Sequence, residues 1–188
     1  EETHLAKNEG TSGKAKDGQK NLSSKPTENN QNKPSINKQK RYSIEDPAKM
    51  TWWLKKVAKF YGCDLIGIAP LDKKWLYSED RKGEPYNFPE ELTFAIVIAV
   101  EMDIDAINTT PKMPSAIATG LGYSKMAFLR TLIADFVVNL GYQAIPAGNQ
   151  GGLSVPLSVL AGLGGYGRMG LLITREYGPR VRIAKILT

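Results

Sequence analysis

The sequence predicts an α+β fold, and three observations lead to that class. Two segments, residues 47–61 and 115–140, repeat apolar side chains at the three- and four-residue spacing of an amphipathic helix. Residues 93–102 form a short run that is apolar on both faces, as expected of a central strand, and residues 181–187 are predicted to form the last strand. Because helices and strands follow without a regular βαβ alternation, the pattern favours α+β over a doubly wound sheet.

The first half of the folded part begins with a helix over residues 47–61, and Gly62 is placed to end it. A short strand over residues 63–69 follows and stops at Pro70. Residues 71–92 are rich in Lys, Glu, Pro and Gly, which predicts a long loop before the central strand.

The second half begins with a long helix that Ser115 is placed to cap and Gly141 to terminate. Further strands are predicted over residues 142–146, 171–174 and 181–187. Since the chain stops directly after the last of these strands, we expect it to be a fragment of a longer protein.

The N-terminal residues differ from the rest in composition and charge. Residues 1–42 are polar and carry nine basic and five acidic side chains, which leaves a net charge of +2 of the total +6 for the remainder. Such a segment buries too little apolar surface to order itself, so we predict a disordered polar tail over residues 1–44 and one folded domain over residues 45–188. The small charge of the folded part argues against nucleic acid as a partner.

The counts of two residue types exclude several kinds of chemistry. Cys63 is the only cysteine, which rules out an internal disulfide framework and any cysteine-rich zinc or iron–sulfur site built by this chain alone. His4, the only histidine, lies in the predicted tail, so Ser-His-Asp and Cys-His catalysis are excluded. Acid–base chemistry is left to Tyr, Lys, Asp or Glu. No apolar run reaches the ~20 residues that span a bilayer, and no signal peptide is recognised.

A glycine-rich stretch follows the second helix, and residues 162–167 match the pattern G-x-G-x-x-G. The dinucleotide-binding interpretation fails, because Pro156 interrupts the run before it, Gly170 the run after it, and the later acidic residue is missing. Two explanations of the glycines stay open: ordinary turns, or backbone that approaches a large flat ligand closely.

Three polar side chains attract attention, each with a structural alternative. Tyr123 follows two glycines near the start of the long helix and is either a half-buried packing residue or, beside a cation, a proton donor. Arg180 and Arg182 are two residues apart at the last strand and either face solvent or receive an anion. Asn149 is either a turn residue or a pocket amide.

Several ordered blocks of the chain resemble the catalytic subunit of corrinoid-dependent reductive dehalogenases. They are residues 61–72, 75–78, 96–103, 118–124, 144–149, 153–157, 161–164, 167–168, 170–174 and 176–182. The resemblance covers roughly residues 47–188, the whole of the predicted folded part, and it implies a nitroreductase-like α+β core that binds a corrinoid.

The resemblance also implies roles for individual residues. Tyr123 would be the proton donor, Arg182 its charge-stabilising neighbour and Asn149 a third polar group near the cobalt, while Thr119 would line the substrate pocket. The corrinoid-binding residues implied are Gly148, Ser154, Gly162, Gly164, Gly167 and Arg168. No metal ligand is expected in this chain itself.

For the longer protein, the resemblance implies a cobalamin-type corrinoid, two [4Fe–4S] clusters whose ligands are absent here, and an organohalide substrate. It implies partners in a small membrane anchor protein and an electron donor of a respiratory chain. It places the enzyme, after export, on the outer face of the cytoplasmic membrane. The fragment alone is expected to be inactive, because nothing in it carries electrons to the cobalt.

Two alternatives remain. One is a cytoplasmic corrinoid enzyme similar to epoxyqueuosine reductase, against which Tyr123 and the long polar leader argue. The other is an inactive corrinoid-binding remnant, which binding without turnover would favour.

Overall fold

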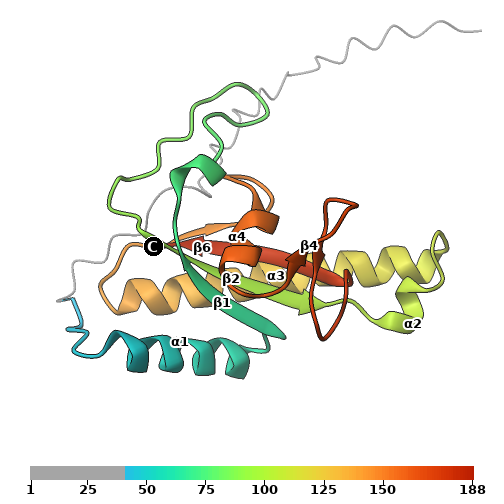
Figure 1. Cartoon of the computed structure of the whole chain (residues 1–188), viewed down its shortest axis with the longest axis horizontal. Helices are drawn as coiled ribbons and strands as arrows, with labels where there is room; N and C mark the ends of the chain where they lie inside the picture. The colour runs from blue at the N-terminus through green and yellow to red at the C-terminus, as the bar shows by residue number, and fades with distance from the viewer. Residues whose placement is uncertain (1–40) are drawn as a thin grey trace, which may run out of the picture.

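An antiparallel four-stranded sheet forms the centre of the computed structural model, which describes residues 41–188 (Figure 1). Its strands lie in the order β1 (Leu65–Pro70), β2 (Phe94–Glu101), β6 (Val181–Leu187) and β3 (Ile145–Ala147). Residues 95–100 of β2 are at most 1% exposed, because both faces of the sheet are covered. The predicted α+β class is confirmed.

Helices α1 (Pro47–Tyr61) and α3 (Met113–Asn139) cover one face of the sheet. The Asp46 side chain caps α1 by accepting hydrogen bonds from two backbone N–H groups, and Gly62 ends it at a φ of 105°. The predicted bounds of this helix are therefore confirmed. Its buried residues meet those of α3 and of alternate strand positions in one apolar cluster, which includes Leu54, Met126 and Ile186.

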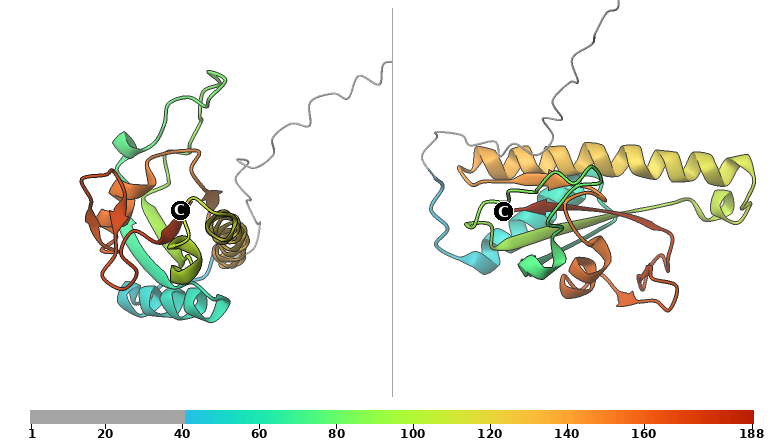
Figure 2. Two further views of the ribbon diagram at one scale, coloured as in Figure 1. Left: turned by 90° about the vertical axis from the view of Figure 1, so that its right-hand side faces the viewer. Right: turned by 90° about the horizontal axis from the view of Figure 1, so that it is seen from above.

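Helix α3 is 27 residues long, about 40 Å, and runs along the sheet and past its end to the short helix α2 (Ile104–Ile107), as Figure 2 shows. The predicted cap is wrong, because the helix begins two residues before Ser115, whose hydroxyl donates to the Lys112 carbonyl. Leu140 is the C-terminal cap residue of α3. Gly141 follows it in the left-handed conformation at φ 85°, as expected of a helix stop.

The other face of the sheet carries the short helix α4 (Ser154–Leu160) and the hairpin of β4 (Gly165–Tyr166) and β5 (Leu172–Ile173). Leu157 of α4 and Leu172 of β5 complete a second apolar cluster on Val97 and Leu187 of the sheet. The loop after β1 includes the 3₁₀ helix η2 (Lys73–Trp75), and its residues Trp75 and Leu76 pack against this second cluster.

The described part of the chain already makes contacts at its first residues. The Tyr42 N–H donates to the Leu140 carbonyl, the Tyr142 hydroxyl donates to the Tyr42 carbonyl, and the Arg41 guanidinium lies 4.5 Å from the centre of the Tyr142 ring. The predicted tail falls almost wholly outside the described residues, so its boundary stays a prediction. Between residues 41 and 188, no helix has the length and apolar character needed to cross a membrane.

Candidate functional site

Strand β6 brings Arg182 to the helix that carries Tyr123. Arg182 shares a strand face with Ala184 and Ile186, which pack on α3. Gly122 makes this approach possible, because a Cβ at that position would lie 2.9 Å from Cγ of Arg182. The guanidinium carbon of Arg182 lies 4.6 Å from the centre of the Tyr123 ring, and one of its nitrogens donates to the Tyr123 hydroxyl at 3.4 Å.

Asn149 reaches the same hydroxyl from the start of the glycine-rich segment. Its side-chain Nδ2 donates to the Tyr123 oxygen at 3.4 Å. Both distances are at the long end of the hydrogen-bond range, and both neighbours are donors, so the hydroxyl proton itself stays available to a third group. The three residues named for proton transfer in the sequence, from three separate elements, therefore meet at one oxygen.

This group faces open space on one side. Tyr123 is 38% exposed, and a Cβ on Gly120, one helical turn earlier, would find no atom within 4 Å. Nε of Arg182 is buried and has no hydrogen-bond partner. Thr119, expected in the substrate pocket, lies at the same end of α3 with its hydroxyl 4.0 Å from the Met102 sulfur.

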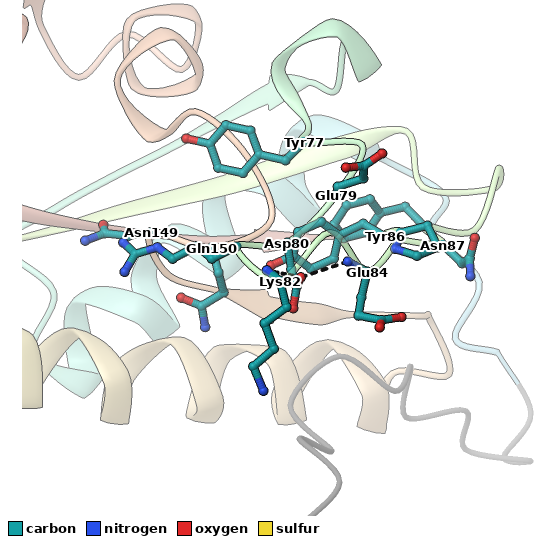
Figure 3. Close-up of a pocket in the computed structure, with 12 residues that line it drawn as sticks. Tyr77, Glu79, Asp80, Lys82, Glu84, Tyr86, Asn87, Asn149 and Gln150 are labelled. Carbon is teal, nitrogen blue, oxygen red and sulfur yellow. Dashed lines mark hydrogen bonds between the residues drawn. The ribbon is translucent and has the colours of Figure 1, made fainter.

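A hollow of about 870 Å³ lies next to Asn149 (Figure 3). Residues of the loop between η2 and β2 line it together with Asn149 and Gln150, and the stacked rings of Tyr86 and Phe88, 5.4 Å apart, form part of its wall. Asp80 orders the loop tip by accepting hydrogen bonds from the backbone N–H groups of Lys82 and Glu84, which also hold the pKa of its carboxyl below its usual value. Sequence patterns gave no sign of this hollow, because a loop has no periodicity.

Lys185 was not singled out in the sequence, and its side chain holds residues 148–154 by hydrogen bonds. Its side chain is 0% exposed, and its Nζ donates to the carbonyls of Gly148 and Gly152 and to the hydroxyl of Ser154 at 2.6, 2.9 and 3.0 Å. Burial, with a smaller effect of nearby Arg130, lowers its pKa to about 8. The available signal was a lysine between the apolar residues Ala184 and Ile186 of a predicted strand.

Contacts within the chain account for most of the predicted cofactor-binding glycines. A Cβ at Gly148 would collide with the Arg130 guanidinium, and one at Gly164 or Gly167 with residue Ile173. Gly162 differs, since it takes a φ of 75° and no atom lies within 4 Å of the Cβ position. Arg168 is exposed in the turn of the β4–β5 hairpin. The cofactor roles of these residues and of Ser154 stay predictions.

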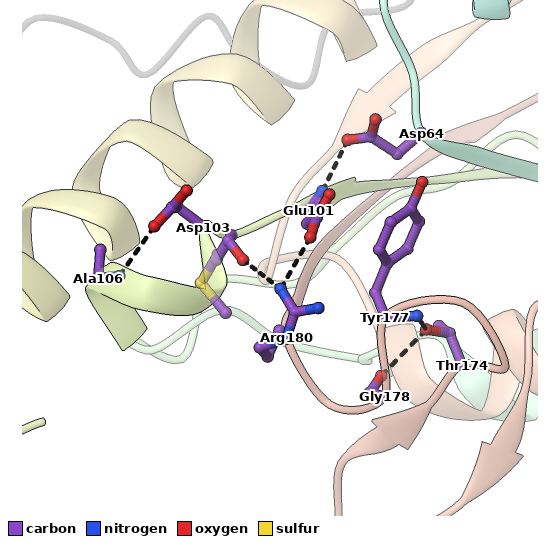
Figure 4. A network of polar contacts seen from close by, with 9 residues as sticks. Asp64, Glu101, Asp103, Ala106, Thr174, Tyr177, Gly178 and Arg180 are labelled. Atoms are coloured by element: carbon purple, nitrogen blue, oxygen red, sulfur yellow. Dashed lines mark hydrogen bonds and ion pairs between the residues drawn. The ribbon is translucent and has the colours of Figure 1, made fainter. Parts of the chain in front are cut away.

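The two arginines near β6 do different things. Arg180 precedes the strand and donates to the Glu101 carboxylate at 2.8 Å and to the Met102 carbonyl at 2.7 Å, which ties the end of β2 to the start of β6 (Figure 4). Asp64 supports this junction by accepting from the Glu101 N–H at 2.7 Å. Arg180 is therefore a structural residue, and the anion-receiving alternative applies to Arg182 alone.

No metal site emerges from the chain's own ligands. The part of the chain from residue 41 onward contains no group of three or more His, Cys, Asp or Glu residues that could hold a metal ion. The single thiol, Cys63, lies in the apolar cluster under α1, and burial raises its pKa to about 12. A thiol that stays protonated is neither a nucleophile nor a ligand.

Comparisons with solved structures define the fold. The chain is similar to a catabolic reductive dehalogenase, NpRdhA, with a TM-score of 0.73 at 20% identity, covering 84% of this chain and 23% of that one. A second structure, reported as suggesting a mechanism for B12-dependent dehalogenation, gives the same TM-score and identity. Epoxyqueuosine reductase bound to a tRNA stem loop is a weaker likeness, with a TM-score of 0.55 at 16% identity over 76% of this chain and 46% of that one. The fold is that of reductive dehalogenases.

Sequence relatives give a more specific assignment. The chain is 38% identical over 185 residues to the tetrachloroethene reductive dehalogenase of Dehalobacter restrictus, 36% identical over 187 residues to that of Desulfitobacterium hafniense and 31% identical over 173 residues to that of Sulfurospirillum multivorans. These matches cover 76–79% of this chain and 33–34% of the relatives. The chain is thus homologous to reductive dehalogenases, as its sequence blocks predicted, and it spans about a third of the length of these relatives. No protein-family model matches it.

Proposed function

We propose that this chain forms the corrinoid-binding core and the proton-delivering site of a reductive dehalogenase. The overall reaction converts an organohalide R–X, two electrons and one proton into R–H and the halide X⁻. The observation that carries the proposal is the convergence of Arg182 and Asn149 on the Tyr123 hydroxyl in a chain homologous to these enzymes.

The residues present fit a corrinoid. One side of the Tyr123 group is open above Gly120, and a buried guanidinium nitrogen of Arg182 has no hydrogen-bond partner in the part of the chain that the structure describes. Backbone of residues 148–170, with Ser154 and Gly162, would hold the macrocycle at the same end of the molecule. When bound, the corrinoid supplies the reducing electrons through its cobalt.

The protein residues supply and control the proton. Tyr123 carries a phenolic hydroxyl, a general acid that is able to protonate the carbon from which the halide leaves. The negative charge left on its oxygen then meets two donors already in place, the Arg182 guanidinium and the Asn149 amide. Donors that need not reorganise stabilise such a developing charge most effectively.

The remaining parts of the enzyme are proposed for the longer protein. Because the chain spans a third of its relatives, two [4Fe–4S] clusters, a membrane anchor partner, a respiratory electron donor and a location at the outer face of the membrane are assigned to that protein. The organohalide is proposed as the substrate class, and tetrachloroethene is the assay substrate that the names of the relatives suggest.

The direct test is a chimera in which residues 45–188 replace the matched third of the Dehalobacter restrictus enzyme. Under anaerobic conditions with a reduced electron donor, the chimera should contain corrinoid and release chloride from tetrachloroethene. Corrinoid content without chloride release would favour the inactive remnant. A chimera that folds, by circular dichroism and gel filtration, but binds no corrinoid would contradict the proposal.

The chain alone provides a second measurement. Incubated anaerobically with hydroxocobalamin and passed through a desalting column, it should retain corrinoid absorbance that bovine serum albumin does not. We expect no turnover from this preparation, because the electron-transfer clusters belong to the longer protein.

A further inference from the structure

The Tyr123 group depends on a residue that touches none of its members' side chains. Asn149 lies at the beginning of a segment, residues 148–153, whose far end is bonded to the loop after β1, where Gly152 bridges Leu76 and the Leu153 N–H donates to the Trp75 carbonyl at 2.7 Å. The side chain that holds this segment is Lys185, which lies on the opposite face of β6 from Arg182.

We propose that Lys185 is a positioning residue that sets the Asn149 amide against the Tyr123 hydroxyl. The functional meaning of this role rests on the proposed function; the geometry does not. Nζ of Lys185 donates to the carbonyl immediately before Asn149, at Gly148, and to the carbonyl of Gly152 at the far side of the turn. Its third donor takes the hydroxyl of Ser154.

These three bonds use the full donor capacity of one ammonium group. Three acceptors spread over seven residues are thereby gathered on a single buried atom, which holds the backbone at Gly148, directly before Asn149, against Gly152 and Ser154. The glycines at 151 and 152, with φ of 85° and 155°, give the backbone the turn that this arrangement requires.

The charge of Lys185 has no anionic partner among the groups that pack around it. From β2 and β3 it faces Val97 and Ala147, from α4 it faces Ser154, and from α3 the charged neighbour is Arg130. A fully buried lysine without a carboxylate is costly to maintain. The charged form of Lys185 is held by three neutral acceptors of the segment, and these three hydrogen bonds fix the shape of the segment.

The protonation state of Lys185 should therefore be visible at Asn149. Above the pKa of about 8, the neutral amine has two donors for three acceptors, so one of the three bonds is lost. In the full chain labelled with ¹⁵N, the side-chain amide signal of Asn149 should shift with a midpoint near pH 8. The Lys185→Met variant should lose this titration.

Lys125→Met is the matched control, because Lys125 is exposed on α3 two residues after Tyr123 and bears the same charge. It should leave the Asn149 titration unchanged. In the Ser154→Ala variant, the charged form loses one acceptor, so the midpoint should move to lower pH. A purely structural lysine would change the melting temperature without coupling its titration to Asn149.

The proposal is overturned if the Asn149 signal of the wild-type chain does not change between pH 6.5 and 9.5, or if Ser154→Ala leaves its midpoint in place. Both measurements hold even if Lys185→Met fails to fold. In the chimera, Lys185→Met should lower kcat for tetrachloroethene about tenfold per bound corrinoid, a measure that separates turnover from any loss of corrinoid at residues 148–154. An inactive chimera would count against the proposed function alone, because the NMR titration needs neither corrinoid nor turnover.

Discussion

Lys185 and Arg182 are two cations three residues apart on β6, and they differ in burial and in hydrogen bonding. Lys185 is fully buried on the α4 face of the sheet, and all three of its donors form hydrogen bonds within the chain. Arg182 lies on the α3 face, partly exposed, with one long hydrogen bond to Tyr123 and one buried nitrogen that has no partner. The two side chains differ in the use of their donors: all three donors of the Lys185 ammonium are bonded, whereas Arg182 Nε has no hydrogen-bond partner among residues 41–188.

The largest effect on turnover should come from replacing Arg182. In the chimera, Arg182→Lys should reduce tetrachloroethene turnover about 100-fold, because an ammonium cannot both stack on the Tyr123 ring and donate to its oxygen as a planar guanidinium does. Arg175→Lys, at an exposed position after β5, is the control and should keep wild-type turnover. Equal rates in the two variants would remove Arg182 from the site.

Burial of the Lys185 side chain should affect the pH dependence of stability. The pKa of Lys185 lies at about 8 in the folded chain and near 10.5 when unfolded, so the unfolded state binds more protons between these values. The free energy of unfolding of the wild type, relative to Lys185→Met, should therefore rise by about 2 kcal/mol as pH goes from 7.5 to 10. Urea titrations at four pH values measure it, and a flat difference would contradict the account.

Two glycines on α3 separate the Arg182 contact from helix propensity. Gly120→Ala should stabilise the chain by about 0.5–1 kcal/mol, because its Cβ would meet nothing and alanine is the better helix former. Gly122→Ala should instead destabilise it by about 1 kcal/mol or more, since its Cβ would press on Arg182 and Met102. Thermal unfolding of both variants gives the comparison, and the same sign of change in both would show that Arg182 does not pack against Gly122.

The smallest expected effect concerns one acceptor of Lys185. Ser154→Ala should cost about 1 kcal/mol, because it removes one hydrogen bond to a buried charge. Ser124→Ala, whose hydroxyl bonds only within its own helix, should change stability by less than about 0.5 kcal/mol. Indistinguishable unfolding curves for the two serine variants would mean that Lys185 does not depend on Ser154.

Local patterns predicted the elements whose signals are local. The bounds of α1 follow from its apolar spacing and Gly62, and β6 matches the strand predicted over residues 181–187 although Arg182 and Lys185 interrupt its apolar residues. Two helix starts did not follow from these patterns: α3 begins two residues before the predicted cap Ser115, and Pro156, expected to interrupt a run, lies inside α4. Pro114 and Pro156 lie in the first turn of their helices, where the missing N–H has no helical partner to lose.

The site could be predicted only in part. Tyr123, Asn149 and Arg182 were named together through family resemblance, since no spacing in the sequence shows that three separate elements meet. Lys185 was missed because its partners lie more than 30 residues away, and a lone lysine in a strand usually faces solvent. The hollow beside Asn149 was missed for the same reason: its walls come from segments that only the fold brings together.

Tyr123→Phe in the chimera tests the central claim most directly. This change removes one hydroxyl and leaves the ring that Arg182 stacks on. Chloride release from tetrachloroethene should fall at least 100-fold while the corrinoid spectrum stays that of the parent chimera. Tyr61→Phe, at the last residue of α1, is the matched control and should release chloride at the parent rate. Undiminished chloride release by Tyr123→Phe would show that the proton comes from elsewhere and would contradict the account.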